Sequence, residues 1–455
     1  MAYVSRSNRA AEFANKANHS HIINDSDVAD FLANCELPKE GDDIKLLEDG
    51  ILVDFVEPTK NPIKYVITVD GGYTEVDVKK SYPSSKIAFF QFGAFLLSLE
   101  DWQNLDNQPF ISPEDMAKFN DLERIKLVLP TKLVSIKGEA NFTSSVRKTI
   151  YDFFMKLRDN TTYMETLKWF VFEEYNATSN ISDYEITNPI HGKEKNITLL
   201  KPKMNKDFTF TIDGDTIYLT DIFRLHEKID DELGAGGILG NIATLIEQLI
   251  IVHHIKYLMK TKVQLLDEIL FIKDGSLAFF DVTARLHTSM RRLINYLHQK
   301  HNLYLVGLEK TGPFADHAQE ISRVFEIEGK EESRLEGNRI LILSNNYIYK
   351  YITPGDPSKM LYGDRSYYSS KVIFKSKTGG VYVTNFPTKD KKVVINPQKS
   401  DFKNIDIILH NLSKLKCEMY DNSLVPVTLA NKLVSLSNHP SQDILEKFAR
   451  NNVKK

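Results

Sequence analysis

The sequence predicts an α/β protein in which a mixed β-sheet is flanked by helices. Two short runs, residues 65–69 and 269–272, are apolar and rich in β-branched residues, as in strands buried on both faces of a sheet. In the second half of the chain, strands alternate with helices: a long helix at 238–259, a helix at 288–299 and a strand at 304–308 follow one another with the second run between them. That alternation is typical of a sheet with helices packed on it.

Length and composition fit one large domain with insertions, or two to three ordinary domains. Of the 455 residues, 42% are hydrophobic and 26% are charged, as in globular proteins that dissolve in water. The net charge of -3 gives the chain no general basic character. A binding site for a polyanion therefore has to be a local patch.

The cysteines and the first residues predict a cytoplasmic protein. Cys35 and Cys417 lie far apart and show no metal-ligand spacing, so we expect both to be reduced. Residues 1–4 lead into Ser, Arg and Asn without the apolar core of a signal peptide. Polar residues interrupt the apolar stretch 238–259, which predicts a buried helix and no membrane span.

The chain divides into a helical N-terminal region and a main domain. Residues 1–58 are predicted to form helices that end near Pro58, and residues 59–455 form the main domain. We interpret residues 100–205, approximately, as an insertion in that domain. Its composition shifts toward Asn, Ser and Thr, and it contains no strand as apolar as the two central runs.

Three apolar runs end in Asp-Gly, at Asp70, Asp213 and Asp274. A carboxylate at the end of a buried strand is costly unless it is paired or binds a metal, but Asp-Gly is also the commonest short hairpin turn. Polar and apolar residues alternate on both sides of Asp213, which predicts a plain turn. The runs before Asp70 and Asp274 alternate less, so the two strand ends, brought side by side, are predicted to form a cation site. A plain turn remains the alternative for each.

Glu247 is the third candidate carboxylate, because it is the only charged residue in the apolar helical segment 242–252. A buried Glu needs a partner, and the helix can aim it at the strand that ends in Asp274. A structural pair with a nearby Lys or Arg is the alternative. Three carboxylates suit Mg²⁺ or Mn²⁺, and such ions activate water for phosphodiester cleavage.

In these motifs the chain resembles the NurA family of nucleases. The resemblance rests on Val69-Asp70-Gly71-Gly72, on the strand end Asp274-Gly275-Ser276-Leu277 and on Val306-Gly307-Leu308-Glu309-Lys310, in that order, over roughly residues 60–455. It implies an elaborated ribonuclease H-like fold related to that of PIWI proteins. It also implies that Asp70, Glu247 and Asp274 are metal ligands, although Glu227, Glu232 and Glu268 are other candidates for the second of these.

Two departures from the family pattern stand out. Gly72 replaces the Ser that usually follows the first Asp-Gly, a change expected to leave the metal site intact. In the C-terminal motif, Asn431 stands where the family has a His. An amide oxygen can coordinate a metal but cannot relay a proton, so either His410 or His439 replaces it, or the protein is slow or inactive.

Several residues are candidates for contacts with a phosphate backbone. Lys310, after the strand 304–308, can neutralise the scissile phosphate, and its alternative is a solvated strand-end lysine. The remaining candidates for DNA binding are Arg285, Arg291, Arg292, Tyr367 and Lys371. Such residues also occur as the solvated face of a helix, or as core tyrosines beside surface lysines.

These observations together predict a Mn²⁺- or Mg²⁺-dependent DNA nuclease. The resemblance further implies a homodimer docked on a HerA-like hexameric ATPase, acting in DNA end processing or antiphage defence. The Gly-rich segment 234–237 lacks the Lys-Ser/Thr of a nucleotide-binding loop, which fits a separate motor. A non-catalytic subunit that binds DNA or regulates the motor is the alternative, and a metal-dependent phosphatase is a third possibility.

Overall fold

The most apolar runs of the chain pair with one another in the middle of a large mixed sheet. The computed structural model describes residues 18–39, 43–82, 84–106, 120–158, 160–327, 330–388, 395–417, 423–436 and 440–453. Its largest sheet has nine strands in the order β1 (Ile51–Asp54), β15 (Arg339–Ile342), β16 (Ser369–Lys375), β17 (Val381–Pro387), β12 (Tyr304–Glu309), β11 (Ile269–Asp274), β2 (Tyr65–Asp77), β3 (Lys86–Ser98) and β4 (Asn120–Lys132). Strands β12, β11 and β2 are parallel neighbours, and the other pairs are antiparallel.

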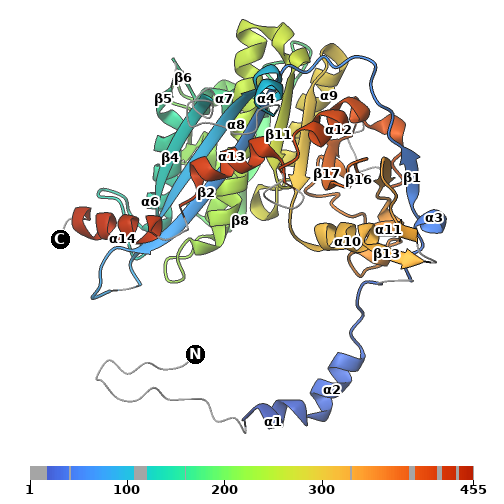
Figure 1. Cartoon of the computed structure of the whole chain (residues 1–455). Coiled ribbons are helices and arrows are strands. Elements are labelled where there is room, and N and C mark those ends of the chain that lie inside the picture. Colours follow the sequence, from blue (N-terminus) through green and yellow to red (C-terminus); the bar gives the residue numbers. More distant parts are fainter. Residues whose placement is uncertain are drawn as a thin grey trace.

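Helices cover both faces of this sheet, as expected for a mixed α/β protein (Figure 1). The helices are α1 (Asn18–Ile23), α2 (Ser26–Ala33), α3 (Leu46–Asp49), α4 (Leu99–Asp106), α6 (Phe142–Met155), α7 (Tyr163–Val171), α8 (Leu239–Thr261), α9 (Leu286–Lys300), α10 (Pro313–Ser322), α11 (Asn345–Tyr351), α12 (Ile405–Lys414), α13 (Val425–Val434) and α14 (Ser441–Asn452). Four small hairpins complete the fold: β5 (Leu157–Arg158) with β6 (Thr161–Thr162), β7 (Asp183–Asn188) with β8 (Gly192–Leu200), β9 (Thr209–Ile212) with β10 (Asp215–Tyr218), and β13 (Val324–Ile327) with β14 (Lys330–Ser333).

The two faces of the central strands bury different clusters. On one side, which we call the α8 face, Val69 and Phe271 pack with α6, α7, α8 and α9. On the other, the α13 face, Val66, Leu270 and Ile272 pack with α12 and α13. Successive residues of a strand point to opposite faces, so this assignment fixes the face of every other residue in β2 and β11.

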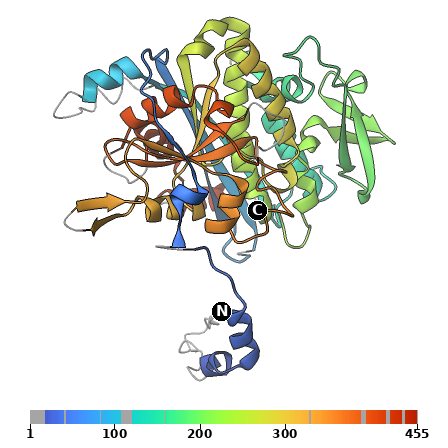
Figure 2. The ribbon, with the colours of Figure 1, turned by 90° about the vertical axis from the view of Figure 1, so that its right-hand side faces the viewer.

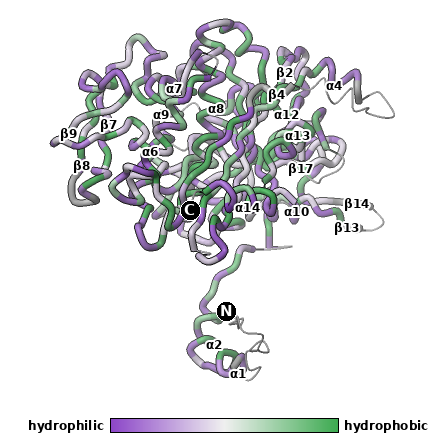
Figure 3. The backbone as a smooth tube through the Cα atoms, turned by 90° about the vertical axis from the view of Figure 1, so that its left-hand side faces the viewer, coloured by the Kyte–Doolittle hydropathy of each residue, from purple (hydrophilic) through white to green (hydrophobic). Residues whose placement is uncertain are grey.

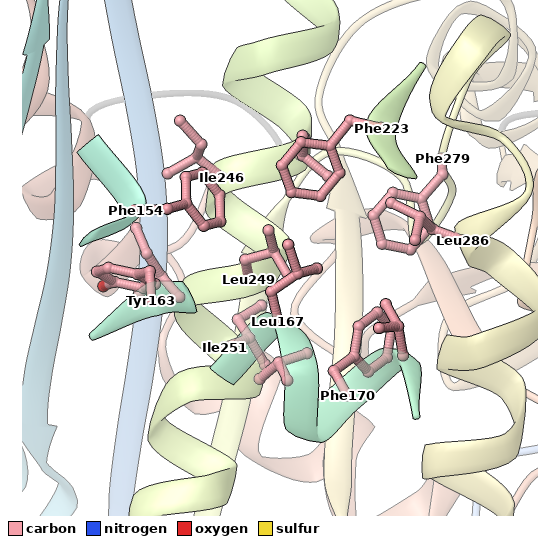
Figure 4. Packing of buried hydrophobic residues seen from close by; sticks show 14 of the residues in the cluster. Phe154, Tyr163, Leu167, Phe170, Phe223, Ile246, Leu249, Ile251, Phe279 and Leu286 are labelled. Carbon is pink, nitrogen blue, oxygen red and sulfur yellow. The ribbon is translucent and has the colours of Figure 1, made fainter. Parts of the chain in front are cut away.

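Helix α8 is the core of its face. Its central residues Ile246, Leu249 and Ile251 pack among aromatic side chains of neighbouring elements (Figure 4). The helix with its preceding turn, Gly236–Thr261, is apolar and long enough to cross a membrane by length and composition, but most of it is buried inside the protein. A backbone view coloured by hydropathy likewise shows hydrophobic stretches in the interior (Figure 3). The predicted buried helix is confirmed.

The structure differs from the sequence-based expectations in three elements. β1 lies within the region expected to be helical, where it pairs with β15. β4 lies within the expected insertion, yet it extends the main sheet for 13 residues. Its inward residues Ile125, Leu127 and Leu129 alternate with outward ones, because only one face of this edge strand is covered, and this alternation made it look weak as a strand. β2 does not end at Val69 but continues to Asp77.

Two further features of the chain match their expectations. Residues Asp213 and Gly214 form the turn of the β9–β10 hairpin, both with positive φ, which confirms the plain turn. Helices α1 and α2 lie away from the sheet (Figures 1 and 2), and α2 has no buried residue. The ribonuclease H-like assignment stays a prediction.

Candidate active site

Asp70 and Asp274 lie side by side on parallel strands. The register of β2 and β11 pairs Val69 with Lys273, so Asp70 and Asp274 occupy the next positions. β11 ends at Asp274, whereas β2 runs on beside β3. Side chains two positions apart in a strand lie on the same face of the sheet. Asp70 and Asp274 are therefore on the α13 face, with Val66 and Ile272 of the same strands. The predicted convergence of these two residues, 204 positions apart in the chain, is present in the fold.

Glu247 reaches the same place from the opposite face of the sheet. It projects from α8, and its Oε2 lies 2.7 Å from the Nζ of Lys273. Both side chains are almost completely buried, at 9% and 4% exposure. Its Oε1 is so close to β2 that a Cβ on Gly71 would stand 3.1 Å from it. Glu247 therefore forms an ion pair with Lys273, as the alternative interpretation of this residue expected.

The three carboxylates influence one another electrostatically. Burial, and then the charges of Asp274 and Glu247, raise the pKa of Asp70 to about 7, against a lowering by the Gly71 N–H and Lys310. Burial also raises the pKa of Glu247, in spite of Lys273. Within the described residues no cationic side chain forms an ion pair with Asp70, whose Oδ1 accepts the Gly71 N–H at 2.8 Å. Of the three carboxylates, Asp70 is therefore the one whose negative charge is least neutralised by neighbouring groups.

Lys310 forms an ion pair with Asp274. Its Nζ is 2.6 Å from Asp274 Oδ2, and the lysine side chain is 23% exposed. The turn after Asp274 is held by a hydrogen bond from Gly275 N–H to the Leu308 carbonyl, at 2.7 Å, with Gly275 at φ +90°. The ends of β11 and β12 are thereby fixed together, which places the predicted phosphate-binding lysine at the acidic site.

A second buried polar cluster adjoins this turn. Glu309 accepts hydrogen bonds from Ser276 Oγ at 2.7 Å and Asn385 Nδ2 at 2.9 Å, and it pairs with Lys371. The Nζ of Lys371 lies over the ring of Tyr367, 4.7 Å from its centroid. Burial alone would raise the pKa of Glu309, but Lys371, Ser276 and Asn385 hold it below its ordinary value.

Three of the five residues predicted to bind DNA lie together and are buried, and the other two pair with other partners. Lys371 and Tyr367 are buried in the cluster just described, and Arg291 is buried with its Nε donating to the Tyr367 carbonyl. Arg292 forms an ion pair with Glu173 at 3.0 Å. In this arrangement Lys371, Tyr367 and Arg291 cannot form a solvated strand-binding surface, because their side chains are enclosed by protein. Arg285 is exposed, and one of its N–H groups donates to the Glu185 carbonyl.

The C-terminal motif lies on α13, which packs on β2 and β3. Asn431 is exposed on this helix. Gly72 accounts for the close packing, since a Cβ at this position would stand 2.5 Å from the Val434 carbonyl oxygen. His410 is buried on α12 beside Glu57, at 3.5 Å, and His439 lies outside the described residues. Neither Asn431 nor His410 has a contact with the three acids among the described interactions.

The donor set fits a hard divalent ion in its chemistry. Asp70 and Asp274 supply carboxylate oxygens from one face of the sheet, as Mg²⁺ and Mn²⁺ prefer. Across the described part of the chain, however, no group of three or more His, Cys, Asp or Glu side chains is arranged to hold a metal. The position of Glu247 across the sheet, with Lys273 against it, explains why the third carboxylate does not complete such a group.

Sequence reasoning missed Lys273 and Glu309. Lys273 is the only charged residue of the strand segment Ile269–Lys273, and the argument applied to Glu247, that a lone charge in an apolar segment needs a partner, would have found it. Glu309 gave no such signal, because it stands beside Lys310 at the end of a strand, where charged residues are common.

Comparisons with known proteins give distant likenesses only. No family profile and no curated protein match the sequence. The fold is similar to the crystal structure of the NurA nuclease from Sulfolobus solfataricus, with a TM-score of 0.36 and 8% identity over 96% of this chain and 97% of that one. It is also similar to a crystal structure of NurA with manganese, with a TM-score of 0.25 and 10% identity over 88% and 91% of the two chains.

Proposed function

We propose that this protein is a metal-dependent DNA nuclease. The observation that carries the proposal is the placement of Asp70 and Asp274 at adjacent positions on parallel strands, with Lys310 on Asp274. The motifs that contain Asp70, Asp274 and Lys310 thus lie together, although they are far apart in the sequence. Their order along the chain resembles that of one nuclease family. Asp70 and Asp274 would hold Mn²⁺ or Mg²⁺, which when bound activates a water and stabilises the leaving oxygen of a phosphodiester.

The chain's own groups prepare this site. Burial of Asp70 keeps bulk water away from one carboxylate, and the short turn through Gly275 fixes the other. Lys310 is partly exposed and can move from Asp274 to a phosphate oxygen, where its charge offsets the charge that develops during cleavage. Arg285 is the exposed basic residue that we retain for contact with the DNA backbone.

The proposal extends to the assembly that the sequence motifs imply. In it, the protein forms a homodimer that acts with a HerA-like hexameric ATPase on DNA ends, in repair or in antiphage defence. The motor would supply the energy. Size-exclusion chromatography with light scattering tests the dimer, and co-elution with such an ATPase tests the partner.

A non-catalytic subunit is the second candidate. Two lysines already neutralise two of the three carboxylates, and Asn431 replaces a residue able to relay protons. Such a protein would bind DNA or regulate the motor without cleaving.

Asp274→Asn distinguishes these candidates. For a nuclease, we expect cleavage of linear duplex DNA in Mn²⁺ to fall by about 10²-fold or more, because the metal loses a charged ligand worth several kcal/mol. Oligomeric state and the unfolding midpoint serve as controls for folding. Unchanged cleavage in the folded variant, or no cleavage by the wild-type chain, would contradict the nuclease and favour the non-catalytic subunit.

A further inference from the structure

We infer that the ammonium group of Lys273 takes the place of a second cation, so that this site binds one divalent ion, held by Asp70 and Asp274, and Glu247 is not a ligand. The inference rests on the proposed function, because it specifies how many ions the same site takes. It concerns a residue that the sequence motifs do not include.

Lys273 makes the contacts of a bound cation. Its Nζ lies 2.7 Å from Glu247 Oε2 and 2.7 Å from the backbone carbonyl oxygen of Asp274. Oxygen atoms of these two kinds are the ligands that hard cations take in proteins. The residue is 3% exposed, so the two oxygens replace most of the water around the ammonium group.

The ammonium group belongs permanently to the site. Lys273 pairs with Val69 of β2 on one side and Gly307 of β12 on the other, in the middle of the nine-stranded sheet. Its backbone is therefore fixed, and its side chain is enclosed beneath α8. Lys310 differs, because it follows the last residue of β12 and its partly exposed side chain can turn into solvent.

Glu247 and the two aspartates reach the site from opposite faces of the sheet. Asp70 and Asp274 follow the residues that face α13, whereas Lys273 and Gly71 occupy the alternate positions that face α8. Glu247 comes from α8 and lies against Gly71 and Lys273. With an ion held between the two aspartates on the α13 side, Glu247 stays on the ammonium group of Lys273 and is not a ligand.

The charges balance for one ion. In the structure, the three carboxylates with Lys273 and Lys310 leave one negative charge. When Lys310 turns into solvent, as its partial exposure allows, two negative charges remain. One divalent ion neutralises them. A second ion would leave two uncompensated positive charges out of water, which is costly.

Isothermal titration of the full chain with MnCl₂ at pH 8 tests this inference. We expect one ion per wild-type chain, and at least about a tenfold weaker affinity for Asp70→Asn. The double variant Glu247→Met with Lys273→Met removes both charges of the buried pair and replaces them with apolar chains of similar size, an exchange that folded proteins tolerate. It should still bind one ion, with an affinity within about threefold of wild type.

A matched control is available in the buried pair of Arg147 and Asp221, which joins α6 to the segment Leu219–Phe223, away from these strands. Arg147→Met with Asp221→Leu removes a buried pair of the same kind and should leave the titration unchanged. Circular dichroism and urea unfolding establish that each variant is folded. If the Met double variant does not fold, Glu247→Gln replaces it, with the same expected single ion.

The outcomes separate this inference from the proposed function. Two results would contradict the inference that Lys273 takes the place of a second cation: binding of two ions by the wild-type chain, and loss of binding in a folded variant without the Glu247 carboxylate. Both results are compatible with a metal-dependent nuclease. Absence of Mn²⁺ binding by the wild-type chain overturns both.

Discussion

Two buried Lys–Glu pairs lie near each other in this protein, and they differ in how completely the glutamate is satisfied. Glu309 pairs with Lys371 and also accepts hydrogen bonds from Ser276 and Asn385, so its pKa lies below its ordinary value despite burial. Glu247 pairs with Lys273 but also faces the charge of Asp274, and burial raises its pKa. The same two residue types, both buried, therefore form two different pairs. In one, which we call the satisfied pair, the glutamate has several hydrogen-bond donors, and in the other the glutamate lies beside another carboxylate.

The difference separates a pair that joins elements of the fold from a pair that lies among other carboxylates. A carboxylate with several donors stabilises the elements that it joins, here β12, β16, β17 and the turn after β11. A carboxylate beside other carboxylates keeps a negative potential that attracts cations, and perturbed pKa values of this kind gather at functional sites. Burial and residue identity alone would have ranked the two pairs as equals.

Breaking the satisfied pair should have the largest effect on stability. We expect Lys371→Met to lower the free energy of unfolding by about 3 to 5 kcal/mol at pH 8, because it leaves Glu309 ionised, buried and without its cation. Urea unfolding followed by circular dichroism measures the loss.

The comparison variant is Lys273→Met. Since the pKa of Glu247 is already raised, this carboxylate can take up a proton, and we expect a smaller loss of about 1 to 3 kcal/mol that shrinks further at pH 6. Equal losses in the two variants, independent of pH, would contradict the distinction between the pairs.

The stability of the protein should depend on pH through the carboxyl group of Asp70. Its pKa is about 7 in the folded protein and about 4 in an unfolded chain, so between these values the folded state holds a proton that the unfolded state has released. The free energy of unfolding therefore falls as the pH rises from about 4 to about 7, by up to about 4 kcal/mol for this group, and is level above.

Asp70→Asn should remove that slope. The difference in unfolding free energy between Asp70→Asn and wild type, measured in metal-free buffer at pH 5 and pH 8, should move in favour of the variant at the higher pH. A difference that stays constant across this range would show that Asp70 is ionised throughout, and that the acids do not form a coupled cluster.

The smallest expected effect comes from closing the gap between Glu247 and β2. A Cβ on Gly71 would stand 2.6 Å from Phe92 Cδ1 and 3.1 Å from Glu247 Oε1, so Gly71→Ala should cost about 1 to 3 kcal/mol by displacing buried side chains. Gly240→Ala, in α8 but with open space around it, is the matched control and should stabilise the protein by no more than about 1 kcal/mol. Equal stability of the two variants would mean that Phe92 and Glu247 do not enclose Gly71.

Four features could be predicted from the residues alone: the mixed α/β class, the buried long helix, the plain turn at Asp213 and the two aspartates that meet at the end of β11. These features depend on local patterns, namely apolar runs, their periodicity and the charged residue that ends them. Lys310 was also found in this way, because it directly follows a strand that pairs with β11.

The cations that pair with the carboxylates, and the basic residues that remain exposed to water, follow from how the chain packs in three dimensions. The burial of Lys371 and Arg291, the role of β4 as an edge strand and the position of Glu247 on the opposite face from Asp70 depend on contacts between distant segments. Strand pairing and helix packing determine those contacts. A local sequence pattern does not indicate which face of a sheet a distant helix will cover.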